Sequence, residues 1–243
     1  MNDNSALFHA ARALLNGRLQ GVLATHSLEC PGYPFGSLVP YTIGPDGWPL
    51  LLLSHLAKHS RNLEAEPKCS LTLVESGEGD SQQLARLTCL GRVTSLPQPA
   101  DTAIERHFRY FPGSRMYHEE LNFHFYRLQP ERFHFVGGFG AARWIGREHL
   151  ERDPLLDPEN ELQLIRRLET GHMPALIGLF DALQQADTGT GEPVEIAGID
   201  GFGIDLRRGE LLLRAGFDSE APSPAAIEQA ALIRLEKPSN SLR

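Results

Sequence analysis

Short apolar segments of strand length, separated by turn-forming residues, dominate the first 150 residues of the chain. Their length, and the Gly, Pro, Asn and Asp residues between them, are typical of strands. The predicted strands are 21–26, 35–43, 49–53, 69–75, 84–95, 123–128, 133–136 and 141–145. A helix is predicted over 6–19, where apolar residues share one face, and helical structure interrupts the strands within 96–122. Because so few helices separate the strands, the pattern favours an antiparallel barrel over a doubly wound sheet.

Beyond the barrel the pattern changes to that of a small α/β domain. Apolar residues repeat with helical spacing over 162–183, with a break at Pro174. Three short strands follow, at 194–199, 202–206 and 210–214. A last helix begins with Ser223 as its N-cap. The chain is therefore predicted to be an α+β protein of two domains, residues 1–152 and residues 153–243.

The composition of the chain argues against several classes of function. The formal net charge is −8, which argues against a general nucleic-acid surface. No apolar run reaches membrane-spanning length, and charged residues occupy the first twenty positions where a secretory signal has its apolar core. A cytoplasmic protein without membrane or nucleic-acid partners is therefore expected. The three cysteines form no CxxC pair, so neither a zinc site nor a disulfide framework is predicted.

Candidate chemistry is concentrated just after the predicted strand 49–53. Hydroxyl, cationic and amide side chains follow one another there, among them Ser54, Ser60, Arg61 and Asn62. Ser60 is predicted to cap a short helix that ends before Pro67, and a helix start offers free N–H groups to an anion. The stretch therefore predicts a cradle for a phosphate group. A solvated strand-to-helix turn without a ligand is the alternative.

Three stretches give the chain a family resemblance. The stretch SHLAKHSRNLEAEPKCSLTL and the stretch FYRLQPERFHFVGGFGAARWI place residues 6–150 close to one family. These residues resemble the pyridoxamine 5'-phosphate oxidase-like, FMN-binding split-barrel family, in the branch that includes haem-utilisation proteins. Residues 158–235, ending in GIDGFGIDLRRGELLLRAGF, are similar to the small α/β domain of unknown function often attached to it.

The resemblance implies a fold, an assembly and a cofactor. It implies a six-stranded split barrel that forms a homodimer, with FMN held at the subunit interface. The protein would then be a flavin-dependent oxidoreductase acting on a small-molecule substrate, because the flavin itself supplies the redox chemistry. The residues that this resemblance assigns to FMN are Ser54, Ser60, Arg61 and Asn62 at the phosphate and Ser37 and Val39 near the ring. No catalytic residue is assigned.

Two other functions remain open on the sequence. The haem-utilisation branch implies a haem-binding protein, and haem iron needs an axial donor such as histidine. The candidate ligands are His134, His149 and His172. A regulatory binding module that has kept the fold without any cofactor is the other alternative.

Overall fold

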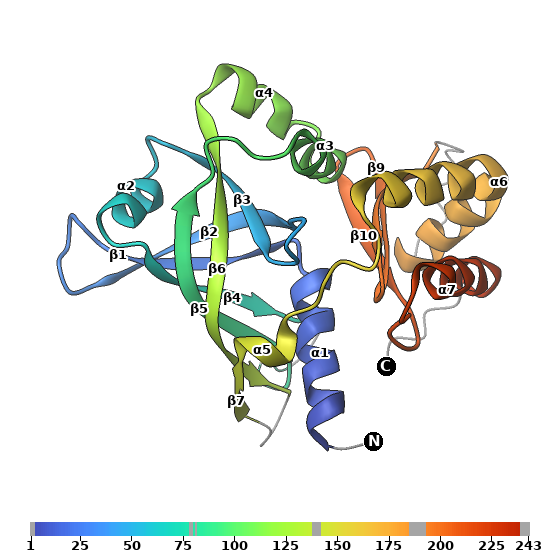
Figure 1. Cartoon of the computed structure of the whole chain (residues 1–243), viewed down its shortest axis with the longest axis horizontal. Coiled ribbons are helices and arrows are strands. Elements are labelled where there is room, and N and C mark those ends of the chain that lie inside the picture. Colours follow the sequence, from blue (N-terminus) through green and yellow to red (C-terminus); the bar gives the residue numbers. More distant parts are fainter. Residues whose placement is uncertain (1–2, 78–79, 81, 138–141, 185–192, 239–243) are drawn as a thin grey trace. The chain divides into compact units, whose positions relative to one another are not determined.

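The computed structural model describes residues 3–77, 80, 82–137, 142–184 and 193–238, and divides the chain into two compact units (Figure 1). Unit 1 comprises residues 1–101 and 113–153, and unit 2 comprises residues 102–112 and 154–243. The end of unit 1 lies one residue beyond the predicted domain boundary. Most of helix α3 (Asp101–Tyr110) lies in unit 2, although its position in the sequence falls within the first predicted domain.

Unit 1 is built mainly of antiparallel strands. These are β1 (Gln20–His26), β2 (Pro34–Ile43), β3 (Pro49–Ser54), β4 (Lys68–Val74), β5 (Arg86–Ser95), β6 (Phe123–Val136) and β7 (Ala142–Gly146). Its helices are α1 (Asp3–Gly17), α2 (Lys58–Ala65), α4 (Ser114–Glu120) and α5 (Arg147–Leu150). The strands follow one another in the order β3-β2-β1-β4-β5-β6-β7, and β3 also pairs with β6. The first six strands therefore close into the predicted barrel.

The barrel core is formed by side chains that alternate between the inside and the outside of the barrel along each strand. Every second residue of β1, β4 and β5 is buried, whereas β3 is buried almost throughout. Helix α1 packs its apolar face, with Ala11 and Leu15 fully buried, against this core. The carbonyl of Leu15, near the end of α1, accepts a 2.7 Å hydrogen bond from the hydroxyl of Tyr41 on β2. The core therefore continues from the strands into the N-terminal helix.

Strand β6 differs from the prediction, which divided it into 123–128 and 133–136. The structure has one strand of 14 residues that runs through Pro130. Proline lacks an N–H group for the ladder and is tolerated at bulges. The β5–β6 register shifts between Leu90 and Gly91, where Gly91 lies opposite Pro130. A Cβ on Gly91 would lie 2.3 Å from the Gln129 carbonyl oxygen, so glycine permits this approach.

Unit 2 has a three-stranded sheet with helices packed on it. Its elements are α3, α6 (Pro158–Gln184), β8 (Glu195–Asp200), β9 (Gly203–Arg208), β10 (Leu211–Gly216) and α7 (Pro224–Glu236). Helix α6 kinks at His172, close to the predicted break at Pro174. Ser223 caps α7 as predicted, since its hydroxyl accepts from the Ala226 amide at 3.3 Å. No helix among the described residues is long and apolar enough to cross a membrane.

A buried ionic cluster attaches α3 to α6. Glu161, in the first turn of α6, is 4% exposed. Both of its carboxylate oxygens accept from Arg106 Nε, at 3.1 and 3.2 Å, and Arg109 Nη2 donates to the same carboxylate at 2.7 Å. One buried carboxylate thus holds two guanidinium groups of α3.

The sheet of unit 2 holds α3 through a second buried carboxylate. Asp205 on β9 is 1% exposed and accepts 2.7 Å hydrogen bonds from the Tyr110 hydroxyl and from Arg214 Nη1. Burial raises the pKa of Asp205, and the charge of Arg214 opposes this rise. A Cβ on Gly198 would lie 2.0 Å from the Tyr110 hydroxyl, so the glycine makes room for the tyrosine. Helix α3 is therefore an integral part of unit 2.

Candidate functional site

The serines predicted to bind a phosphate make hydrogen bonds inside their own loop. Helix α2 begins at Lys58 with Ala57 as N-cap, so the prediction that Ser60 caps the helix is wrong. Ser60 lies inside the helix, is fully buried, and donates from Oγ to the Ser54 carbonyl at 2.7 Å. The Ser54 hydroxyl accepts from the Leu56 amide at 3.3 Å. The Ser60 hydroxyl therefore closes the strand-to-helix turn.

Arg61 and Asn62 point in different directions from α2. Arg61 is exposed, and its guanidinium makes no hydrogen bond or ion pair with other described residues. Asn62 is 4% exposed and uses its amide to hold Leu28 and Thr25. Of the four predicted phosphate ligands, Ser60 and Asn62 are therefore buried, whereas Ser54 and Arg61 are more accessible. Their role in binding a phosphate remains a prediction.

The two predicted ring contacts lie two residues apart on β2. Ser37 is half-buried, opposite Leu23 of β1. Val39 is 1% exposed and belongs to the barrel core, so its side chain is directed away from any ligand on the outer face.

The three candidate haem ligands are distributed over the chain. His134 lies on β6, with its ring 4.8 Å from that of Trp144 on β7. His149 lies on α5, where it stacks on Phe8 at 4.6 Å. His172 is exposed at the kink of α6, in unit 2. Of these three, His134 shares the outer face of the barrel with the hollow described next.

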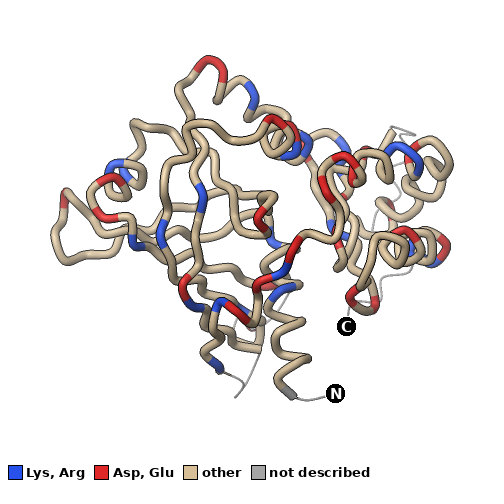
Figure 2. Tube along the Cα trace, in the orientation of Figure 1, with Lys and Arg blue, Asp and Glu red and all other residues tan. Residues whose placement is uncertain are grey.

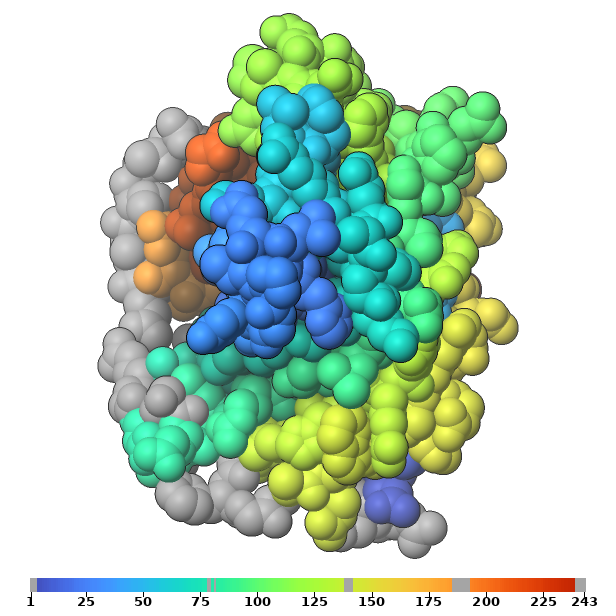
Figure 3. Space-filling view, turned by 90° about the vertical axis from the view of Figure 1, so that its left-hand side faces the viewer, coloured from blue at the N-terminus to red at the C-terminus, as the bar shows by residue number. Residues whose placement is uncertain are grey.

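A hollow of about 440 Å³ opens on the outside of the barrel. One wall is the end of β1 with the β1–β2 loop (residues 27–33) and the start of β2, and the other comes from β4, β5 and β6. The lining residues are Ala24, Thr25, His26, Gly32, Tyr33, Pro34, Lys68, Cys69, Ser70, Leu90, Gly91 and Glu131. In Figure 3 the loop forms the blue prominence beside α2. The volume is within the range of about 300–1,000 Å³ usual for small-molecule sites.

The hollow presents donor groups that the fold does not use. The side chains of His26, Tyr33 and Lys68 make no hydrogen bond or ion pair with other described residues. Tyr33 is 71% exposed. The carboxylate of Glu131 is already paired with Arg92, at 3.0 Å. An imidazole, a phenol and an ammonium group are therefore available to a ligand.

Cys69 adds no reactive group to this set. Burial raises the pKa of its thiol to about 12. The thiolate is the form that binds metals, and it is scarce so far below the pKa. His26 is therefore the better metal donor in the lining.

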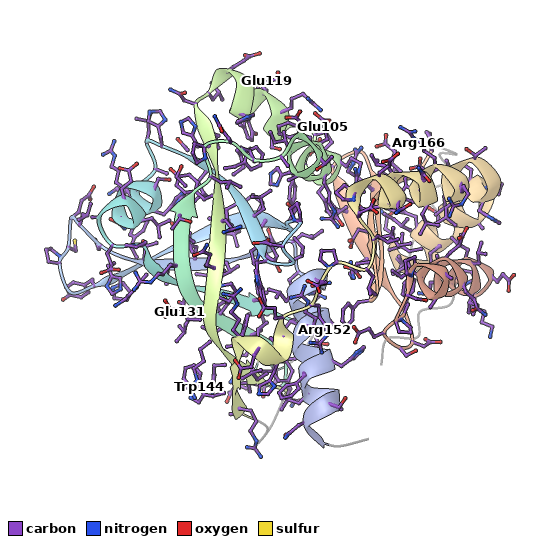
Figure 4. All side chains as sticks on the ribbon, in the orientation of Figure 1. Glu105, Glu119, Glu131, Trp144, Arg152 and Arg166 are labelled. Atoms are coloured by element: carbon purple, nitrogen blue, oxygen red, sulfur yellow. The ribbon has the colours of Figure 1, made fainter. Side chains whose placement is uncertain are left out.

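The outer face continues beyond the hollow as an aromatic and cationic cluster. Leu90, which lines the hollow, lies opposite Arg132 of β6. The Arg132 guanidinium lies 4.7 Å from the ring centroid of Trp144, which is 52% exposed and labelled on β7 in Figure 4. His134 contacts the same indole, so a cation, an indole and an imidazole lie together on one exposed sheet face.

Sequence reasoning missed His26, Tyr33 and Lys68. In the sequence, His26 and Tyr33 lie near a turn-rich loop and Lys68 lies about 40 residues further on. The three come together only because β1 pairs with β4, and no local pattern shows that pairing. Among the described residues, no group of three or more His, Cys, Asp or Glu side chains could hold a metal ion by itself.

Comparison with known proteins places the barrel in one family. The family described as "CREG, beta-barrel" matches residues 3–152. The chloroplastic heme oxygenase HOZ of Arabidopsis thaliana is 33% identical over 131 residues, which is 54% of this chain. The match spans only 40% of the length of HOZ.

Two solved structures match nearly the whole chain. A protein of unknown function from Agrobacterium tumefaciens, Atu2129, is 28% identical with a TM-score of 0.66, and the match covers 92% of each chain. A heme binding protein from Mycobacterium smegmatis is 26% identical with a TM-score of 0.55, and the match covers 96% of this chain and 97% of that one. Both units therefore recur together in other proteins.

Proposed function

This chain belongs to the CREG β-barrel family, and we propose that it binds haem in the hollow on the outside of its barrel. The observation that carries the proposal is the set of unused donors in that hollow, an imidazole, a phenol and an ammonium group. The relatives named for haem, HOZ and the mycobacterial protein, support it.

The lining residues fit the chemistry of haem. His26 offers an imidazole nitrogen of the kind that binds haem iron. Lys68 offers a cation for a propionate carboxylate. Ala24, Pro34 and Leu90 offer apolar surface to the macrocycle. When bound, haem would supply iron-centred redox chemistry, and the chain would hold and orient it.

A titration of the purified protein with haem, followed by absorbance, tests the proposal. We expect a saturable shift of the Soret band that is absent when FMN is added instead. FMN binding without haem binding would support the flavin-dependent oxidoreductase predicted from the sequence, in which Ser54 and Arg61 retain accessible groups for the phosphate. Failure of both ligands to bind would support the cofactor-free module.

We also propose that the outer face of β1 and β2 is covered by a second copy of the chain. Val22 and Leu38 lie directly opposite each other there and are 47% and 68% exposed. Neither strand carries a Lys, Arg, Asp or Glu residue (Figure 2). Contiguous exposed apolar surface of this kind marks interaction sites. A symmetric pair would bring two hollows near one interface.

The variant Leu38→Lys is expected to convert a dimer to a monomer, because it places a charge at the centre of this apolar face. Light scattering at matched concentrations measures the change. Leu211→Lys is the matched control, since Leu211 is 39% exposed on β10 of unit 2. A wild-type monomer, or a dimer that survives Leu38→Lys, contradicts the proposed interface.

A further inference from the structure

Asn62 connects helix α2 to the loop that forms one wall of the hollow. Its side-chain oxygen accepts from the Leu28 amide at 3.0 Å, and its side-chain nitrogen donates to the Thr25 hydroxyl at 2.9 Å. The Thr25 hydroxyl in turn donates to the Phe35 carbonyl at 3.3 Å. Thr25 precedes the β1–β2 loop, Leu28 lies at its start and Phe35 follows it. One buried amide therefore holds the start of the loop directly and reaches the residues that follow it through the Thr25 hydroxyl.

The loop has its own internal hydrogen bonds. The Ser27 amide donates to the Tyr33 carbonyl and the Tyr33 amide to the Cys30 carbonyl, each at 3.1 Å. The Ser27 hydroxyl accepts from the Cys30 amide at 3.0 Å. Gly32 has φ +86°, a conformation that favours glycine. Since the loop is closed on itself, its attachment to the barrel decides where Tyr33 lies.

A further contact between α2 and the loop is at the surface. Lys58 Nζ lies 2.7 Å from a Glu29 carboxylate oxygen, and both side chains are more than half exposed. Exposed ion pairs of this kind contribute little to stability. Asn62 is 4% exposed, and its loss would leave the Leu28 amide and the Thr25 hydroxyl without their present partner. The β1–β2 ladder pairs His26 with Pro34 at the base of the loop, and the buried hydrogen bonds of α2 to this hairpin come from Asn62.

We propose that Asn62 is a positioning residue for haem in the hollow, acting through the β1–β2 loop. The inference rests on the proposed function, because it needs a ligand that the loop contacts. Asn62 itself touches no ligand in this role. It sets the position of Tyr33 before the ligand arrives, and a wall held in place in advance lowers the entropy lost on binding.

The test uses Asn62→Leu, which keeps much of the side-chain volume and removes both hydrogen bonds. We expect haem affinity to fall by about tenfold, because the wall of the hollow is no longer held in place before the ligand binds. Amides of residues 28–33 should exchange with deuterium faster in the ligand-free variant. Asn62→Asp, which retains an acceptor for the Leu28 amide, should have intermediate affinity. Lys58→Ala, on the same helix, should bind haem like the wild type.

A double-mutant cycle with Tyr33→Ala separates positioning from a general loss of stability. If Asn62 acts through the loop, Asn62→Leu will cost little affinity once Tyr33 has been removed, whereas independent effects will add. Tryptophan fluorescence checks that each variant has a folded barrel, because both tryptophans lie in unit 1. Additive losses, or wild-type affinity in Asn62→Leu, overturn the positioning role. Absence of haem binding in the wild type overturns the proposed function itself.

Discussion

Replacement of His26 by alanine is expected to lower haem affinity by more than about 100-fold, because loss of a group that only orients a metal ligand already costs 10–100-fold. His26 is exposed at the end of β1 and lines the hollow, with no other described residue bonded to its ring. Its loss would leave the iron without the proposed axial nitrogen, so the Soret band of any residual complex should also shift. A haem titration followed by absorbance measures both changes.

His134→Ala is the matched control, since His134 was the sequence-based candidate on the same outer face. Its ring contacts Trp144, so its removal should change haem affinity much less than removal of His26. Free imidazole added to His26→Ala should restore part of the wild-type spectrum. If His134→Ala abolishes the Soret shift and His26→Ala retains it, the iron ligand is His134 and our assignment is wrong.

Glu161→Gln is expected to destabilise unit 2 by about 3–5 kcal/mol, the cost of removing one partner of a buried ionic group. The neutral amide would leave Arg106 and Arg109, whose side chains are 16% and 22% exposed, without their shared counter-charge. Unfolding by urea, followed by circular dichroism, measures the loss. The tryptophan signal from Trp48 and Trp144 reports unit 1 only, so it should change less than the dichroism.

Glu228→Gln provides the comparison in the same unit. Glu228 pairs with Arg167 at 3.0 Å, and their side chains are 38% and 55% exposed. Surface pairs contribute about 0–1 kcal/mol, so this variant should unfold near the wild type. Equal stability of the two variants would mean that α3 is not held by the Glu161 cluster.

Much of the fold follows from local pattern. The alternation of buried and exposed residues in β1 and β5, the cap at Ser223 and the interruption at Pro174 are visible within a few neighbouring residues. Strand β6 was divided in the prediction because Pro130 is a turn signal in isolation. The bulge beside Gly91, a residue distant in sequence, allows the strand to continue.

The candidate site could be predicted less well from local pattern. The polar stretch after β3 was correctly recognised as a strand-to-helix connection, but Ser60 and Asn62 carry similar polar groups whether they face a ligand or the protein. Their hydrogen bonds to Ser54, Leu28 and Thr25 form only when the loop and α2 are packed together. Whether such a side chain binds a ligand or stabilises the fold depends on the direction in which it points, and residue type does not reveal that direction.

By itself, the sequence predicted short antiparallel strands typical of a barrel, followed by the helices and strands of a small α/β unit, because strand and helix periodicity are local properties of the chain. The tertiary structure alone decided that α3 belongs to the second unit and that His26, Tyr33 and Lys68 line one hollow. These groupings depend on which distant strands pair and which buried charges meet. Neither the spacing nor the type of the residues records that information.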